Sequence, residues 1–133
     1  MKTMFFAPPL LALLLTACGG GGADALAEIE SLREQAAAKE KEARALGVDI
    51  PCSVNLQCGG LAFASTVSAC GAFAYQPYSL VSSSAKLAET AAAAQRQLAA
   101  SLVALLPPEP CPAAPSQLPP GFSCVVSICI QTP

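Results

Sequence analysis

The pattern of apolar and polar positions predicts a helix in the N-terminal third of the chain. Residues 24–46 are rich in Ala, Leu, Glu, Lys and Arg, which are strong helix formers. Asp24 is expected to cap the N-terminus of this helix, and Gly47 is well placed directly after its last turn.

Apolar residues recur along this helix at heptad spacing, at Leu26, Ile29, Ala36 and Ala43. Arg33 and Glu40 occupy the intervening core positions, which weakens the case for a coiled-coil trimer. The same two side chains are spaced to form ion pairs with Glu30 and Arg44. We therefore expect a solvated helical stalk about 34 Å long.

A second helix is predicted from Ala85 to Leu106. Ser82–Ser84 precede it and offer several N-caps, and Pro107 and Pro108 end it. One face of this helix is apolar at spacings of three and four residues. The residues on that face are Leu87, Ala91, Ala94, Leu98, Leu102 and Leu105.

Short β-prone runs lie on both sides of the second helix. Residues 61–67 and 73–75 precede it, and Ser123–Gln131 is expected to be one strand because of its alternating and β-branched residues. Residues 107–120 contain seven prolines and should be extended and stiff. The predicted fold class is α+β, a small disulfide-stapled domain with one long helix and a few short strands, preceded by the helical stalk.

The N-terminus has the parts of a secretory signal: Lys2, an apolar run from Met4 to Leu15, and small residues after it. The run is too short to span a bilayer about 30 Å thick. It ends in Leu15-Thr16-Ala17-Cys18, which resembles the lipobox of bacterial lipoprotein precursors. The resemblance implies removal of residues 1–17 and a lipid on Cys18; the alternative is an ordinary signal peptide.

Gly19–Gly22 follow Cys18 and form a flexible spacer. Because Gly19, and not Asp, follows the cysteine, the resemblance implies the periplasmic face of the outer membrane of a Gram-negative bacterium. The predicted order is a leader over 1–17, lipidated Cys18 and spacer over 18–23, the stalk over 24–47, and a Cys-rich domain over 48–133.

The mature chain is poor in charge. Loss of Lys2 would leave six basic and nine acidic residues. There is no basic stripe, so nucleic acid is not an expected partner. Beyond Cys52 the charged residues are Lys86, Glu89, Arg96 and Glu109. A domain with so little charge has little colloidal repulsion, and a membrane tether or a partner would keep it dispersed.

Apart from Cys18, the chain has six cysteines: Cys52, Cys58, Cys70, Cys111, Cys124 and Cys129. An even number in a small exported domain predicts three disulfides. If residues 123–131 form one strand, Cys124 and Cys129 stand about 16 Å apart and cannot pair with each other. One would then reach Cys111, and the other the cluster of Cys52, Cys58 and Cys70. A bridge between Cys52 and Cys58 stays open only if Ser53–Gln57 forms a turn.

Metal and cofactor chemistry is not indicated. The cysteines contain no Cys-x-x-Cys pair, and the chain has no histidine. Catalytic arrangements that need histidine are thereby excluded. Glu89 and Glu109 are the carboxylates of the domain, and no pattern brings them together. We expect no enzyme activity, no cofactor and no metal.

One short motif is found in a class of enzymes. Ser83-Ser84-Ala85-Lys86 matches the Ser-x-x-Lys of penicillin-recognising enzymes, which also need a Lys-Thr-Gly strand. No lysine follows Lys86 in this chain, and Ser83 has a simpler role as a helix cap.

A second resemblance covers about a fifth of the mature chain. Cys58, Cys70-Gly71 and Tyr75-Gln76-Pro77-Tyr78-Ser79 are similar to a pattern in small Cys-rich exported bacterial lipoproteins without an assigned activity. Ala72 departs from the second glycine of that pattern. The resemblance implies a disulfide-stapled periplasmic module.

Tyr75 and Tyr78 are a candidate recognition patch, because tyrosine combines contact area with a polar group. The alternative is that both pack on the second helix with their hydroxyls bonded to the backbone. The leading hypothesis is a non-enzymatic, membrane-anchored lipoprotein that acts as a binding or structural module of the envelope, with another envelope component or an exported protein as its partner. The alternative is a membrane-displayed inhibitor of a secreted or periplasmic hydrolase, with Pro107–Pro120 as its rigid loop.

Overall fold

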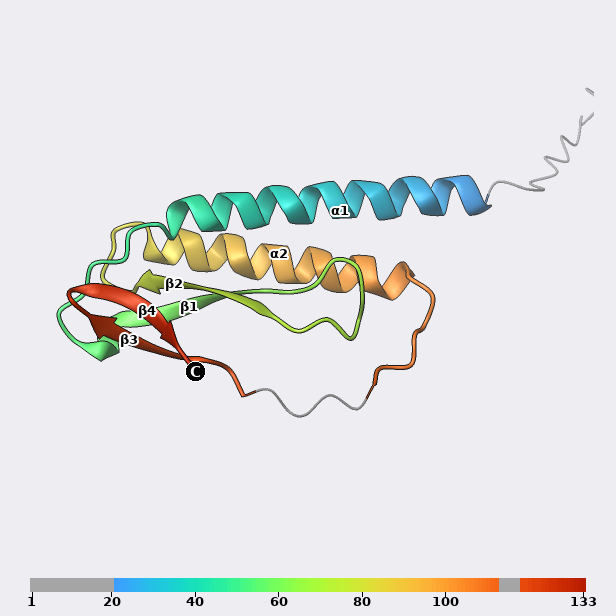
Figure 1. The fold of residues 1–133 in the computed structure, drawn as a ribbon. Helices are drawn as coiled ribbons and strands as arrows, with labels where there is room; N and C mark the ends of the chain where they lie inside the picture. The colour runs from blue at the N-terminus through green and yellow to red at the C-terminus, as the bar shows by residue number, and fades with distance from the viewer. Residues whose placement is uncertain (1–20, 113–117) are drawn as a thin grey trace, which may run out of the picture.

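The computed structural model describes residues 21–112 and 118–133, which form three layers (Figure 1). Two antiparallel helices, α1 and α2, make the first layer. The strand pair β1–β2 is the middle layer, and the hairpin β3–β4 is the third. The predicted α+β class is confirmed. The leader and Cys18 lie outside the described residues.

Helix α1 runs from Gly21 to Leu46 and begins earlier than predicted. Asp24 lies inside its first turn, so the predicted N-cap is wrong. Gly21 and Gly22 are helical and do not form part of a spacer. Both predicted ion pairs are present: Arg33 lies 2.8 Å from Glu30, and Arg44 lies 2.7 Å from Glu40.

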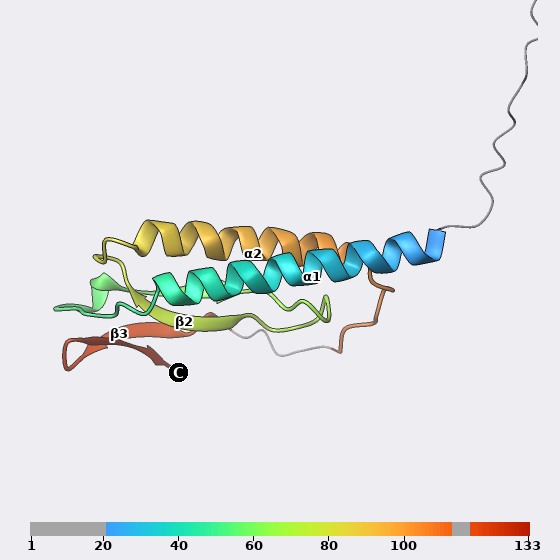
Figure 2. The ribbon, with the colours of Figure 1, turned by 90° about the horizontal axis from the view of Figure 1, so that it is seen from above.

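Helix α1 packs lengthwise on α2 (Figures 1 and 2). Its heptad positions Ala36 and Ala43 are fully buried. Only the first turns project beyond α2, where Leu26 is 69% exposed. The predicted helix ahead of the Cys-rich part is confirmed, but it is not a separate solvated stalk, because it packs along α2. The heptad face is real, but its partner is a helix of the same chain.

Helix α2 runs from Ala85 to Leu105 and buries a face made mainly of alanines. Leu87 and Leu105 of the predicted face are exposed, at 62% and 41%. Short side chains let α1 and α2 approach closely, so alanines occupy the contact. The buried residues of α2 are Ala85, Ala88, Ala91, Ala92, Gln95, Ala99 and Leu102.

In the described part of the chain, neither helix is both long and apolar enough to cross a bilayer.

Strands β1 (Cys58–Phe63) and β2 (Ala74–Ser79) pair antiparallel, with Gly60 opposite Pro77. They overlap the predicted runs only in part. Leu61, Phe63 and Tyr78 enter one core cluster with the alanines of the helices. Gly47 provides the necessary space, because a Cβ there would lie 2.6 Å from Cδ1 of Leu61.

The C-terminal segment is a hairpin, so the prediction of a single strand over 123–131 is wrong. Strand β3 (Gly121–Val125) pairs antiparallel with β4 (Ile128–Thr132). Val126 and Ser127 form the two-residue turn with φ of 50° and 61°. Two positive φ values match the right-handed twist of a hairpin.

The hairpin packs on the face of β1–β2 away from the helices (Figure 1). The segment before β1 is tied to β4, because the N–H of Cys52 donates to O of Ser127 (3.1 Å) and the N–H of Cys129 donates to O of Ile50 (2.9 Å). Gly60 lies under the ring of Phe122, which a Cβ at this position would overlap.

Three disulfides staple the layers, as predicted: Cys52–Cys124, Cys58–Cys129 and Cys70–Cys111, with Cα separations of 5.8, 5.4 and 5.3 Å. Cys124 and Cys129 do not pair with each other, as expected, but the stated reason is wrong. They face each other across the hairpin, and each reaches a different cysteine near β1. The expected link from Cys111 to the C-terminal segment is also wrong.

Candidate functional site

A cleft of about 490 Å³ lies between α2 and β1. Residues 60–62 of β1 form one wall, and one face of α2 forms the other. The α2 residues in this cleft are Glu89, Thr90, Ala92, Ala93 and Arg96. We call this the β1 cleft. It contains two of the four charged side chains that follow Cys52.

The side chains of Tyr78 and Glu89 are hydrogen-bonded to each other at one end of the β1 cleft. The Tyr78 hydroxyl donates a hydrogen bond to Oε1 of Glu89, and Tyr78 is only 4% exposed. Burial, the hydrogen bond to Glu89 and the negative charge of Glu89 together raise the pKa of Tyr78 well above the ordinary value for a phenol. Tyr78 therefore stays a protonated donor that holds the Glu89 carboxylate in place.

Arg96 bonds the backbone of β1 at the other end of the cleft, and the neighbouring Gln95 bonds Ala64, the residue directly after β1. Nη1 of Arg96 donates to O of Ala62 (2.9 Å). The buried amide of Gln95 donates to O of Ala64 (2.9 Å) and accepts from the N–H of Ala64 (3.0 Å). The side-chain amide of Gln95 thus supplies Ala64 with the donor and the acceptor that a neighbouring strand would otherwise provide.

The structure separates the two tyrosines of the predicted recognition patch. They are three positions apart in β2 and therefore point to opposite faces of the sheet. Tyr75 contacts the hairpin side, with its ring centroid 6.5 Å from Phe73 and 6.3 Å from Phe122. Tyr78 is buried on the helix side, and its partner is Glu89. A single patch containing both residues does not form.

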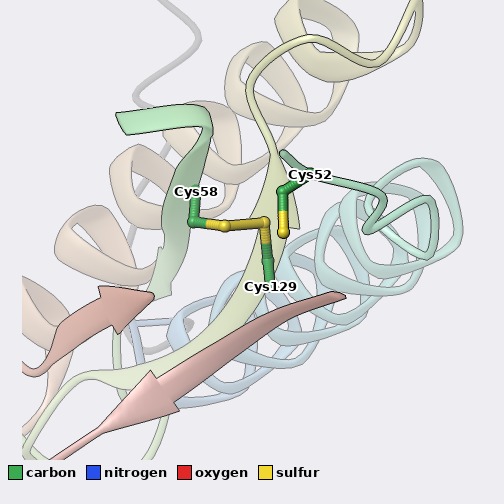
Figure 3. A group of neighbouring side chains, drawn as sticks. All are labelled: Cys52, Cys58 and Cys129. Atoms are coloured by element: carbon green, nitrogen blue, oxygen red, sulfur yellow. A yellow bond between two sulfur atoms is a disulfide. The ribbon is translucent and has the colours of Figure 1, made fainter. Parts of the chain in front are cut away.

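The sulfurs of Cys52, Cys58 and Cys129 lie within 4.8 Å of one another (Figure 3). Cys58 and Cys129 are bonded to each other, and the Cys52 sulfur points toward them from its own bond to Cys124. Zinc binds thiolates, and in this oxidised form all three sulfurs are in disulfides. The cluster consists of sulfurs from two adjacent disulfides, and its role is structural.

The other candidate groups are not assembled. Ser83 and Lys86 are both exposed at the start of α2. The N-cap is Ser84, and its Oγ donates to O of Leu46 (2.8 Å), so it links the end of α1 to the start of α2. Glu89 lies about 24 Å before the C-terminal end of α2, and Glu109 lies beyond that end. The two carboxylates are far apart.

The sequence interpretation missed Gly60, Gln95 and Arg96 as a group. Two adjacent glycines, Gly59 and Gly60, directly after Cys58 were a usable signal, because glycine inside a strand marks a close approach by another element. The role of Gln95 had no such signal. The β1 cleft offers a carboxylate, a guanidinium and backbone amides of a strand edge, which are groups suited to binding.

No family model matches the chain, and neither does any curated protein or solved structure.

Proposed function

We propose that the protein is a lipid-anchored module of the bacterial cell envelope that binds or supports another envelope component and does not catalyse a reaction. The observation that carries the proposal is Leu15-Thr16-Ala17-Cys18 directly after an apolar run. Three disulfides in one small domain support export, because disulfides persist in oxidising compartments such as the periplasm. Gly19 favours the periplasmic face of the outer membrane.

The anchor would hold the domain close to the bilayer. Each buried methylene of an acyl chain contributes about 0.8 kcal/mol, so two or three chains give stable attachment. Helix α1 begins at Gly21, and three residues reach at most about 10 Å from Cys18. The projecting first turns of α1 would therefore face the membrane, and the three-layer body would extend away from it.

Metabolic labelling with an alkyne fatty acid tests the anchor. The wild-type protein should take up the label, and Cys18→Ser should not, because the thiol that accepts the diacylglycerol is gone. Thr16→Ala keeps a small residue before the cleavage site and should be labelled like the wild type. Label retained on Cys18→Ser, or absent from the wild type, would contradict the proposal.

A binding role is consistent with how the domain uses its charge. Glu89 and Arg96 each make a hydrogen bond within the chain, which fixes the position of both charges at the β1 cleft. Cross-linking in intact cells, followed by purification from membranes, should identify an envelope protein attached near α2. Capture of no protein by probes placed at exposed residues such as Thr90 and Gln97 would count against this role.

A second candidate is a membrane-displayed inhibitor of a secreted or periplasmic hydrolase. It is favoured by one observation: residues 107–112 are exposed and stiffened by prolines, and the Cys70–Cys111 disulfide fixes them to the body. A rigid exposed loop loses little entropy when an enzyme binds it. Assays of lysozyme and protease inhibition by the purified protein test this candidate, and uniformly unchanged rates would eliminate it.

A further inference from the structure

We propose that two copies of the protein associate through the free edge of β1 and form a continuous four-stranded sheet about a twofold axis at Gly60. The inference concerns self-association and goes beyond the proposed function. It rests on which backbone groups of β1 point away from β2, and on the two charges of α2 above that edge.

The register of β1 and β2 determines which groups face outward. Gly60 lies opposite Pro77, which has no N–H, so this pair cannot be hydrogen-bonded across the strands. The bond from the N–H of Leu80 to O of Gln57 (2.8 Å) gives the same alternation. The N–H and C=O groups of Cys58, Gly60 and Ala62 therefore point away from β2.

Two of these six outward groups already have partners. The N–H of Cys58 donates to O of Asn55, and O of Ala62 accepts from Arg96. Four groups remain: O of Cys58, both groups of Gly60, and the N–H of Ala62. No described residue of the chain bonds these four groups, and Gly60 and Ala62, which carry three of them, line the β1 cleft.

The four remaining groups complement themselves across a twofold axis. In an antiparallel pair centred on Gly60, the two Gly60 residues exchange two hydrogen bonds. Cys58 then lies opposite Ala62 of the second copy, so the N–H of Ala62 donates to O of Cys58 in both directions. A complete ladder would also contain bonds from the N–H of Cys58 of one copy to O of Ala62 of the other. These bonds are not needed, because both groups already have hydrogen-bond partners within their own chain.

The charges above the edge follow the same symmetry. Glu89 and Arg96 are seven residues apart on α2, or about 10 Å, with Ala92 and Ala93 midway between them. A twofold axis at Gly60 makes the two α2 helices antiparallel, and each Glu89 then lies opposite Arg96 of the second copy. The alanines allow helices to approach to about 8 Å. A second copy therefore matches this edge in both hydrogen bonds and charge.

Charge reversal on the full-length lipoprotein in detergent tests the pairing by native mass spectrometry. The wild type should be a dimer. Glu89→Arg alone would put two arginines together, and Arg96→Glu alone two glutamates, so each variant should dimerise roughly tenfold more weakly or worse. A mixture of the two variants, one labelled with ¹⁵N, should form the mixed dimer, because both of its charge pairs are attractive.

A backbone variant tests the edge itself. Ala62→Pro removes one outward N–H and should abolish the dimer, whereas Ala62→Val retains the N–H and should dimerise normally. Circular dichroism checks that both variants keep the fold. If Ala62→Pro does not fold, the mixing experiment decides alone. A monomeric wild type, or a mixture no more dimeric than its two components, would overturn the proposal.

Discussion

Removing either of two disulfides should destabilise the protein less than its loop length suggests, because the other disulfide still joins the same two segments. Removing both should cost more than the sum of the two single removals. Cys52–Cys124 and Cys58–Cys129 span sequence separations of 72 and 71 residues. Both join the same two segments, the stretch from Cys52 to the first residue of β1 and the C-terminal hairpin. Once one bridge has formed, the second closes only the small ring between the two.

The chain-entropy model gives the magnitudes. Cys70–Cys111 stays intact in all the variants and shortens the effective loop of either bridge to about 30 residues. A single bridge over such a loop contributes about 3.6 kcal/mol, whereas a second bridge closing a ring of about 13 residues contributes about 3 kcal/mol. Removing either bridge should therefore lower the free energy of unfolding by about 3 kcal/mol, and removing both by about 6.5 kcal/mol. The coupling between the two bridges is the difference of about 0.8 kcal/mol.

Urea unfolding of four proteins measures this coupling. They are the wild type, Cys52→Ala with Cys124→Ala, Cys58→Ala with Cys129→Ala, and the quadruple variant. The cycle cancels the local packing cost of each substitution. All four are measured in the same concentration of a stabilising osmolyte, because the quadruple variant has little stability to spare. A coupling of zero would show that the two bridges constrain the unfolded chain independently, and would refute the reasoning.

Three further predictions concern single side chains. Gln95→Met keeps the volume but leaves both backbone groups of Ala64 unpaired, so the free energy of unfolding in urea should fall by about 2–4 kcal/mol. The unfolded chain loses the Tyr78 proton near pH 10 while the folded state still holds it. The contribution of Tyr78 to the free energy of unfolding should therefore be fully present below about pH 10 and fall above it. A Tyr78→Phe variant that keeps the full decline would contradict this. Gly60→Ala should cost roughly 1–3 kcal/mol in thermal or urea unfolding because its methyl group overlaps a ring of β3, whereas Gly22→Ala, with nothing within 4 Å, should be neutral or stabilising.

Both helices were predictable because composition and proline stops act locally. Their partners were not. The heptad face of α1 signals a helical partner, but the same pattern fits a second chain and a second helix of one chain equally well. The alanine face of α2 was misassigned because its leucines are more hydrophobic, although close packing on α1 favours small residues such as Ala88 and Ala92.

The C-terminal hairpin shows where local signals fail. A two-residue turn with positive φ usually contains Gly, Asn or Asp, and Val126-Ser127 contains none of them. The surrounding structure imposes this turn, since two disulfides and the bond from Cys52 to O of Ser127 hold the hairpin. The number of disulfides followed from the count of cysteines, but their connectivity depended on this turn.

The β1 cleft could be predicted only in fragments. Gly59 and Gly60 indicate a close approach, and Arg96 stands out as one of four charges after Cys52. The sequence does not reveal that Arg96 and Gln95 reach the same strand edge, because that depends on how α2 crosses β1. The alternative that Tyr78 packs on the second helix is confirmed, but its hydroxyl bonds the Glu89 side chain of α2 and not the backbone.

Mass spectrometry of the N-terminal peptide of the protein purified from bacterial membranes tests the central claim most directly. We predict a peptide that begins at Cys18 and carries a diacylglycerol on the thiol and a further acyl group on the amine. A mature chain that begins at any other residue, or a Cys18 without lipid, would contradict the account.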